Sequence, residues 1–145
     1  MGVVERRPAR DMTPGYPQHR RRTFPGQPDQ MKQVRLFLDR VLDGCPAAPI
    51  VIQLANELTT NAVVHSESKE EGGRFRIRVH IRKGEWVRIA VWDQGGPWGG
   101  HAREDHTPDE HGNGLFLVEA VAREWGMVSN ASGRTVWFRC AWSAA

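Results

Sequence analysis

The sequence predicts an α+β domain, a two-layer sandwich in which helices cover one face of a mostly antiparallel sheet. Residues 75–82 alternate apolar and basic side chains, the period-two pattern of a strand whose second face meets water. Two segments before this strand and one after it place apolar residues three or four positions apart, as amphipathic helices do. Because the helices precede and interrupt the strands, instead of alternating with each strand, the order favours α+β over α/β.

The bulk composition indicates one compact domain preceded by a basic tail. With 145 residues and 39% hydrophobic side chains, the chain is long enough to bury a single core. The formal net charge of the chain is +3. Residues 1–22 carry six Arg and two acids, a net charge of +4, so the net charge of residues 23–145 is −1. We therefore expect a flexible Arg/Pro-rich tail over 1–22 and a folded domain over 23–145. A nearly neutral domain is expected to offer no basic face and no direct contact with nucleic acid.

The cysteine content and the hydropathy pattern favour a soluble cytoplasmic protein. The two cysteines, Cys45 and Cys140, lie in no metal-ligand spacing, and so few thiols are typical of a reduced cytosolic chain. No stretch approaches about 18 consecutive apolar residues, and the N-terminus lacks the apolar core of a signal peptide. We expect no association with a membrane.

The first half of the chain predicts one short strand and two helices. Residues 23–25 are expected to form an edge strand, because Pro25 cannot donate a hydrogen bond to a neighbouring strand. A helix over 28–42 has an apolar face made of Met31, Val34, Leu36, Phe37, Leu38 and Val41. A second helix, over 48–65, has an apolar set made of Val51, Leu54, Ala55, Leu58 and Ala62.

The second half of the chain is expected to supply most of the sheet. Its elements are, in order, strands over 75–81 and 86–92, a loop over 97–111, a helix over 112–123, and strands over 125–130 and 135–142. The complete order is β-α-α-β-β-loop-α-β-β. Large aromatic side chains at strand and strand-end positions are expected to pack in the core: Trp86, Trp92, Trp137 and Trp142.

A polar stripe runs along the second helix. Gln53, Glu57, Asn61 and His65 are spaced by four, so they lie on one side of the helix. Such a stripe is often just the solvated face, but Asn is unfavourable inside a helix, and this one sits among small and apolar neighbours. An amide oxygen suits Mg²⁺, and a carboxylate one turn earlier could polarise a water or hydroxyl beside that ion.

Two glycine-containing segments offer further ligand groups. Asp93 ends an apolar strand and presents two acceptors to an amino group such as that of adenine, while Gly95 lets the backbone approach a flat ring. Residues 112–115, Gly-Asn-Gly-Leu, open a helix whose backbone N–H groups could hold phosphate. Taken alone, the first segment is more typical of a β-turn and the second of a flexible hinge into a helix.

Taken together, the three segments resemble a known family. Glu57-x-x-x-Asn61-Ala62, Asp93-x-Gly95-Gly96 and Gly112-x-Gly114-Leu115 are similar to the N, G1 and G2 boxes of the histidine-kinase-like ATPase (GHKL) superfamily. Within it, the chain resembles bacterial anti-sigma-factor serine/threonine kinases and the small ATP-binding regulatory proteins of actinobacteria. The resemblance covers about residues 23–142 and extends to flanking sequences: Phe24-Pro25-Gly26, Asn61 to His65, Gly96-Pro97-Trp98 and Gly133 to Phe138.

The resemblance implies a Bergerat-type ATP-binding fold with ATP and Mg²⁺ as ligands. Asn61 would coordinate Mg²⁺, Glu57 would be the general base, and residues 97–111 would form a lid over the nucleotide. Arg103 is the only non-titrating cation of that lid. A hydroxyl at Thr135 is expected near the adenine-binding Asp93. The implied nucleotide-binding positions are Asn61, Asp93, Gly95, Arg103, Gly112, Asn113, Gly114, Leu115 and Thr135.

The family relation also implies partners and leaves two functions open. A kinase would phosphorylate an anti-anti-sigma (STAS-type) protein, sequester a sigma factor, or do both, and would act in transcription regulation as a homodimer. The alternative is a catalytically weak ATP-binding module that acts by protein–protein binding, because the lid is short of cations. A nucleic-acid binder acting through its Arg tail is the third reading, and the neutral domain disfavours it. Three lid histidines are expected to make the lid pH-sensitive more than to bind metal: His101, His106 and His111.

Overall fold

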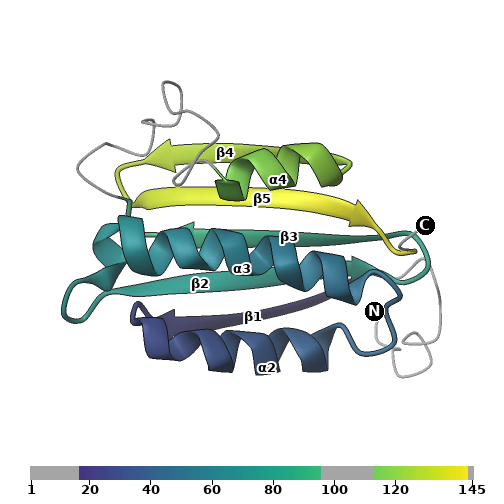
Figure 1. The fold of residues 1–145 in the computed structure, drawn as a ribbon, viewed down its shortest axis with the longest axis horizontal. Helices are drawn as coiled ribbons and strands as arrows, with labels where there is room; N and C mark the ends of the chain where they lie inside the picture. Colours follow the sequence, from purple (N-terminus) through teal and green to yellow (C-terminus); the bar gives the residue numbers. More distant parts are fainter. Residues whose placement is uncertain (1–16, 96–112, 144–145) are drawn as a thin grey trace, which may run out of the picture.

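The fold is a two-layer α+β sandwich, as predicted. The computed structural model describes residues 17–95 and 113–143. Five antiparallel strands form one sheet in the order β1-β2-β3-β5-β4, and the helices lie on one face of it (Figure 1). The elements are β1 (Pro17–Pro25), η1 (Pro28–Gln30), α2 (Met31–Val41), α3 (Ala48–His65), η2 (Glu67–Lys69), β2 (Arg74–Arg82), β3 (Trp86–Asp93), α4 (Asn113–Val121), β4 (Glu124–Asn130) and β5 (Gly133–Ala141).

The core lies between the helices and the inner face of the sheet. The five apolar residues predicted on the second helix are all buried in α3. In α2, Val34 and Leu38 are buried as expected, but Leu36 is 47% exposed because it sits about 200° around the helix from Val34. Both cysteines are buried and free. None of the helices in the described part of the chain is long and apolar enough to cross a membrane.

The first strand is longer than predicted. β1 begins at Pro17 instead of residue 23, and it pairs with β2 along its whole length, from Pro17 opposite Arg82 to Pro25 opposite Arg74. Phe24 anchors the pair, since its ring stacks on Phe75 with 5.3 Å between the centroids. The expected tail boundary at residue 22 is therefore wrong. The arginines at 20, 21 and 22 belong to the sheet, and residues 1–16 lie outside the described residues.

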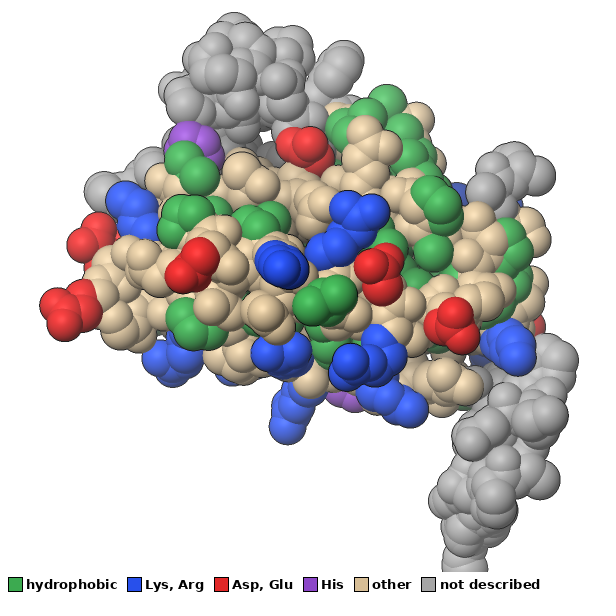
Figure 2. All heavy atoms as spheres, turned by 60° about the horizontal axis from the view of Figure 1, so that its bottom comes forward, with side chains coloured by type: hydrophobic (Ala, Val, Ile, Leu, Met, Phe, Trp, Pro, Cys, Tyr) green, Lys and Arg blue, Asp and Glu red, His purple; other side chains and the backbone are tan. Residues whose placement is uncertain are grey.

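The outer face of the sheet, opposite the helices, is basic and aromatic. Directly paired residues share a face, so the register assigns alternate strand positions to this side. Its arginines are Arg21, Arg74, Arg76, Arg78, Arg82, Arg88 and Arg139, and its tryptophans are Trp86, Trp92 and Trp137. The expectations that the folded domain has no basic face and that these tryptophans fill the core are both wrong. Lys and Arg side chains gather along the lower edge of Figure 2, which is the side of this face.

Candidate functional site

The polar stripe of α3 is only partly solvated. Gln53 is exposed, whereas Glu57, Asn61 and His65 are half-buried. Helix α3 packs against α4 and β3, the elements that carry the other two predicted segments. The Glu57 carboxylate and the Asn61 amide therefore lie one turn apart on the same side of the helix, where both can reach one ligand.

Asp93 is fixed by two hydrogen bonds at the end of β3. Its residue is 2% exposed, and it lies on the inner face opposite Arg134 of β5. Oδ1 accepts a hydrogen bond from Gly95 N at 2.7 Å, and Oδ2 accepts one from Arg134 Nη2, also at 2.7 Å. Both side chains of this ion pair are 3% exposed. A carboxylate has about four acceptor positions, so each oxygen can still accept a further donor such as an amino group.

Two buried serines connect the end of α3 to the end of β3. The Ser66 hydroxyl accepts a hydrogen bond from Ser68 N at 2.9 Å, and the Ser68 hydroxyl accepts one from Gln94 N at 2.9 Å. Next to them, Glu67 N donates to Gly95 O at 2.5 Å. Both serines are 0% exposed. The turn η2 therefore holds the segment after Asp93 against the C-terminal end of the helix that carries Glu57 and Asn61.

Two glycines make room for this turn. A Cβ on Gly26 would lie 1.8 Å from the carbonyl oxygen of Ser68, and a Cβ on Gly73 would lie 2.1 Å from the same atom. Gly26 N also donates to Gly73 O at 3.0 Å, which joins the segments that follow β1 and precede β2. Only Gly fits at either position without moving η2. The serines and both glycines were missed as site residues, because their role depends on contacts between distant segments.

Arg134 takes the place beside Asp93 that was expected for Thr135. Thr135 pairs with Trp92 and so lies on the outer face, away from the Asp93 carboxylate. The prediction for Thr135 is therefore wrong in this structure. Gly133 precedes Arg134 at φ +140°, and a Cβ there would lie 2.2 Å from Asp93 O. The Gly-Arg pair at the start of β5 therefore contacts both the backbone and the carboxylate of Asp93.

The remaining predicted ligands are described only in part. Arg103, Gly112, residues 97–111 and the lid histidines lie outside the described residues. Asn113, Gly114 and Leu115 form the first described turn of α4, so the predicted helix is confirmed from Asn113 onward. The first N–H groups of a helix have no partner within the helix, and in α4 they are candidates for holding phosphate.

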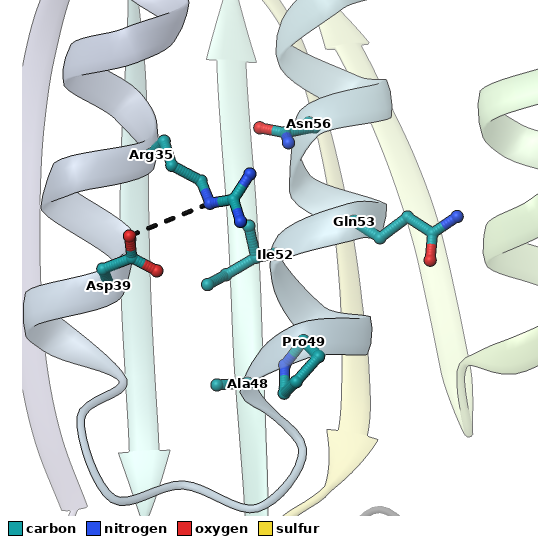
Figure 3. A pocket seen from close by; sticks show the side chains of 7 residues that line it. All are labelled: Arg35, Asp39, Ala48, Pro49, Ile52, Gln53 and Asn56. Atoms are coloured by element: carbon teal, nitrogen blue, oxygen red, sulfur yellow. Dashed lines mark ion pairs between the residues drawn. The ribbon is translucent and has the colours of Figure 1, made fainter.

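A separate cavity lies between α2 and the N-terminal half of α3. It has a volume of about 350 Å³ and is lined by Arg35, Asp39, Ala48, Pro49, Ile52, Gln53 and Asn56. Figure 3 shows Arg35 and Asn56 pointing toward one another, while Gln53 points to the other side of α3. Arg35 Nε lies 3.8 Å from Asp39 Oδ2, and both side chains are more than half exposed. None of the predicted nucleotide ligands lines this cavity, so it is distinct from the site around Asp93.

The sheet order, with the helices on one face, defines the ATP-binding fold of histidine-kinase-like proteins. The chain belongs to the histidine kinase-like ATPase family, whose domain model matches residues 24–140. Among solved structures it is similar to the blue-light activated histidine kinase of Erythrobacter litoralis EL346, with a TM-score of 0.54 and 20% identity over 79% of this chain and 41% of that one. The histidine kinase domain of that protein gives 0.48 and 18% identity over 77% of this chain and 59% of that one. No curated protein matches.

The described residues fit a nucleotide and a magnesium ion. Membership of an ATPase family implies ATP binding, and Asp93 is a buried, oriented acceptor of the kind that an adenine amino group needs. Mg²⁺ keeps several waters and takes few protein ligands, so a single amide oxygen at Asn61 suits it. Among the described residues, no group of three or more His, Cys, Asp or Glu side chains could hold another kind of metal. Arg134, which is not among the predicted ligand positions, adds a buried cation next to Asp93.

Proposed function

We propose that the chain is an ATP-dependent serine/threonine protein kinase of the anti-sigma-factor type. The observation that supports this best is the arrangement of Glu57 and Asn61, half-buried one turn apart on the helix that η2 ties to the Asp93 segment. The proposed substrate is an anti-anti-sigma protein of the STAS type, and the proposed outcome is release or sequestration of a sigma factor. We also propose a homodimer as the working form.

The residues of the site would divide the reaction between them. Asp93 and Gly95 would hold the adenine, and the N-terminus of α4 would hold phosphate. Asn61 would bind Mg²⁺, which supplies charge neutralisation at the phosphates. Glu57 would accept the proton of the partner's hydroxyl as its oxygen bonds to the γ-phosphorus. The bond from that phosphorus to the bridging oxygen breaks, and ADP leaves with the electron pair.

Replacing the proposed base separates transfer from binding. Glu57→Gln is expected to lower γ-phosphate transfer to an anti-anti-sigma protein by about 100-fold or more, the usual contribution of a general base, with little change in ATP affinity. Transfer is measured with radiolabelled ATP and the anti-anti-sigma proteins of the source cell. Glu70→Gln, at an exposed carboxylate directly after η2, is the matched control and is expected to transfer normally. Equal transfer by Glu57→Gln and the control would remove Glu57 from the mechanism.

Replacing the proposed magnesium ligand tests nucleotide binding itself. Asn61→Ala is expected to lose the magnesium-dependent part of ATP affinity, because it removes the amide oxygen and leaves Asp93 in place. Isothermal titration with ATP in magnesium and in EDTA measures this directly. An affinity that matches the unmodified chain in both buffers would contradict the assignment of Asn61.

A regulatory module that binds ATP without transferring phosphate is the second candidate. It is favoured by the lid composition, in which Arg103 is the only arginine or lysine between residues 97 and 111. In that case the unmodified chain retains a sigma factor or anti-anti-sigma protein in an ATP-dependent pull-down but labels neither. ATP binding with partner labelling supports the kinase, and ATP binding with retention alone supports the module.

A further inference from the structure

The outer face of the sheet has a strong excess of positive charge. Across β1, β2 and β3 its residues form rows, such as Arg21 beside Arg78 and His19 beside His80, with Arg88 paired to His80. The only carboxylate among the described strand residues on this face is Glu124 of β4, which is ion-paired with Arg139. The helices and the candidate nucleotide site lie on the other face of the sheet, so this charge serves neither the core nor Asp93.

Three tryptophans form a line through this basic face. Trp86 and Trp92 lie six residues apart on β3, roughly 20 Å at the rise of a strand, and Trp137 on β5 lies between them opposite Ala90. Two of the rings lie over glycines of the neighbouring strand. A Cβ on Gly133 would come within 2.7 Å of Trp92 Nε1, and a Cβ on Gly126 within 2.7 Å of Trp137 Nε1. The glycines therefore allow the indoles to lie close to the sheet.

Guanidinium groups lie over these rings. The Arg76 guanidinium is 5.1 Å from the centre of the Trp92 ring, and the Arg88 guanidinium is 4.6 Å from that of Trp137. Stacked cations of this kind present planar groups and positive charge together. Burial lowers the pKa of Arg88, and the charge of Arg78 lowers it further, which reflects how closely the cations are placed.

We propose that this outer face binds single-stranded nucleic acid. The arginines would contact the phosphates, and bases would stack on the indole rings and guanidinium planes. A β-sheet that carries aromatic side chains on its central strands, with basic residues around them, is a known platform for unpaired bases. An acidic protein is the other polyanion to consider, but its carboxylates would pair with the guanidinium groups alone, whereas an unpaired strand uses both the positive charges and the planar rings.

The positive charge of this face was not visible in the net charge of the chain. The sequence placed the excess charge in the tail and left residues 23–145 at −1. In the structure, β1 brings Arg21 into the sheet, and the alternation of β2 directs its arginines to one side. Segregation by face creates a basic surface on a nearly neutral domain. The proposal does not depend on kinase activity, because it concerns the face of the sheet opposite the nucleotide site.

The first test compares matched charge removals in the full chain. Arg21→Gln, Arg76→Gln and Arg78→Gln are combined in one variant, and Lys32→Gln, Arg35→Gln and Arg40→Gln on exposed positions of α2 in another. Binding of a fluorescein-labelled 20-nucleotide single-stranded RNA and DNA is followed by anisotropy between 50 and 200 mM salt. The outer-face variant is expected to bind at least tenfold more weakly and to lose about two units of the log–log salt slope. The α2 variant is expected to bind like the unmodified chain.

The second test concerns stacking and keeps the charge constant. Trp137→Leu is expected to weaken binding roughly tenfold with an unchanged salt slope, whereas Trp137→Phe, which keeps a ring, is expected to lose much less. This pair does not depend on the triple variant. The thermal unfolding curve of each variant shows that it is folded before binding is compared.

Several outcomes would overturn the proposal. It fails if the unmodified chain does not bind at 50 mM salt, or if the outer-face and α2 variants lose affinity equally. A third variant replaces Arg6, Arg7 and Arg10 by Gln. The proposal also fails if this variant no longer binds while the outer-face variant binds like the unmodified chain, since the N-terminal segment would then be the binding element. Competition by poly-glutamate as effective as that by RNA at equal charge would point to an acidic protein partner instead.

Discussion

At the scale of single residues, the contact between Arg134 and Asp93 is the central feature of the candidate nucleotide site. The two side chains are buried to the same extent, and Arg134 Nη2 lies 2.7 Å from Asp93 Oδ2. Gly95 N donates a hydrogen bond to the other carboxylate oxygen, Oδ1. Asp93 therefore does not need a ligand to fix its orientation. A ligand amino group would meet a carboxylate already in place, which reduces the ordering cost of binding.

Removing Arg134 is expected to destabilise the fold strongly. Arg134→Ala removes the cation that pairs with the buried Asp93 carboxylate. The uncompensated charge is expected to lower the free energy of unfolding by about 3–5 kcal/mol. Urea denaturation followed by far-UV circular dichroism measures this loss. Arg139→Ala is the control, because its partner Glu124 is half-exposed, and the expected loss there is at most about 1 kcal/mol. Equal losses for the two variants would show that the buried pair contributes no more than the surface pair.

At the scale of elements, the short turn η2 connects two long elements that are distant in sequence. It follows α3 directly, bonds to Gln94 and Gly95 after β3, and packs between the backbones of Gly26 and Gly73. The distance between the α3 stripe and the Asp93 segment is therefore set by a turn of three residues and its two serines. Small shifts of η2 would change the width of the site without changing the core.

Neighbouring glycines allow this role of η2 to be tested. Gly73→Ala would place a Cβ 2.1 Å from Ser68 O, so η2 must shift, and ATP affinity is expected to fall about tenfold or more. Gly72→Ala meets nothing within 4 Å and only strains a residue at φ +79°, at about 1–2 kcal/mol of stability. Titration calorimetry with ATP on both folded variants compares them. A loss of affinity that follows stability alone, equal in the two, would contradict a positioning role for η2.

At the scale of the whole molecule, the two faces of the sheet have opposite characters. One face is mostly apolar and packs against the helices, and the other carries stacked cations, aromatic rings and a pair of histidines. The rings of His19 and His80 stack across β1 and β2 with 4.2 Å between their centroids and an interplanar angle of 2°. Charging either ring would add like charge to a face that is already positive.

Global stability is expected to decrease in mild acid for this reason. Burial lowers the pKa of both histidines. The charges of Arg78, Arg21 and Arg20 lower the pKa of His19 further, and those of His19, Arg88 and Arg78 lower the pKa of His80. As the pH falls below about 6.5, the two histidines bind protons in the unfolded chain before they do so in the folded chain. Their contribution to the free energy of unfolding is therefore fully present above that pH and is lost progressively below it. Urea midpoints measured between pH 7.5 and 5.5 test this.

The double variant His19→Asn, His80→Asn serves as the control for the pH effect. It is expected to flatten the dependence of the urea midpoint on pH over this range, because Asn does not titrate. His80 Nδ1 is buried without a hydrogen-bond partner among the described residues, so a proton added there gains no acceptor. An unchanged pH dependence in the double variant would place the effect elsewhere in the chain.

Local sequence patterns predicted most helices and strands correctly. The features that they failed to predict depend on contacts between distant segments. The alternation of β2 and the helical spacing of α3 were sufficient for those elements, and α3 has the predicted bounds. The length of β1 depends on pairing with β2, because its own run of arginines does not resemble a strand. The tryptophans were placed in the core by size, yet the register of β3 and β5 turns three of them outward.

Some residues of the candidate site could likewise be predicted from local patterns, and others could not. Glu57, Asn61, Asp93 and Gly95 could be found because each follows from a residue type at a helix turn or a strand end. Arg134 and Ser68 could not, because their partners are 41 and 26 residues away. The error at Thr135 is a one-residue matter of strand parity, since neighbouring positions point to opposite faces of the sheet.

The arginine-rich first strand also affects how copies of the chain meet. β1 is an edge of the sheet, and an edge strand exposes backbone groups that can pair with another molecule. Three consecutive arginines occupy the middle of this edge, and a proline stands at each end. Like charges repel a second such edge, and proline offers it no N–H. The strand therefore protects the protein from edge-to-edge aggregation, and at physiological salt the repulsion acts over only about 8 Å.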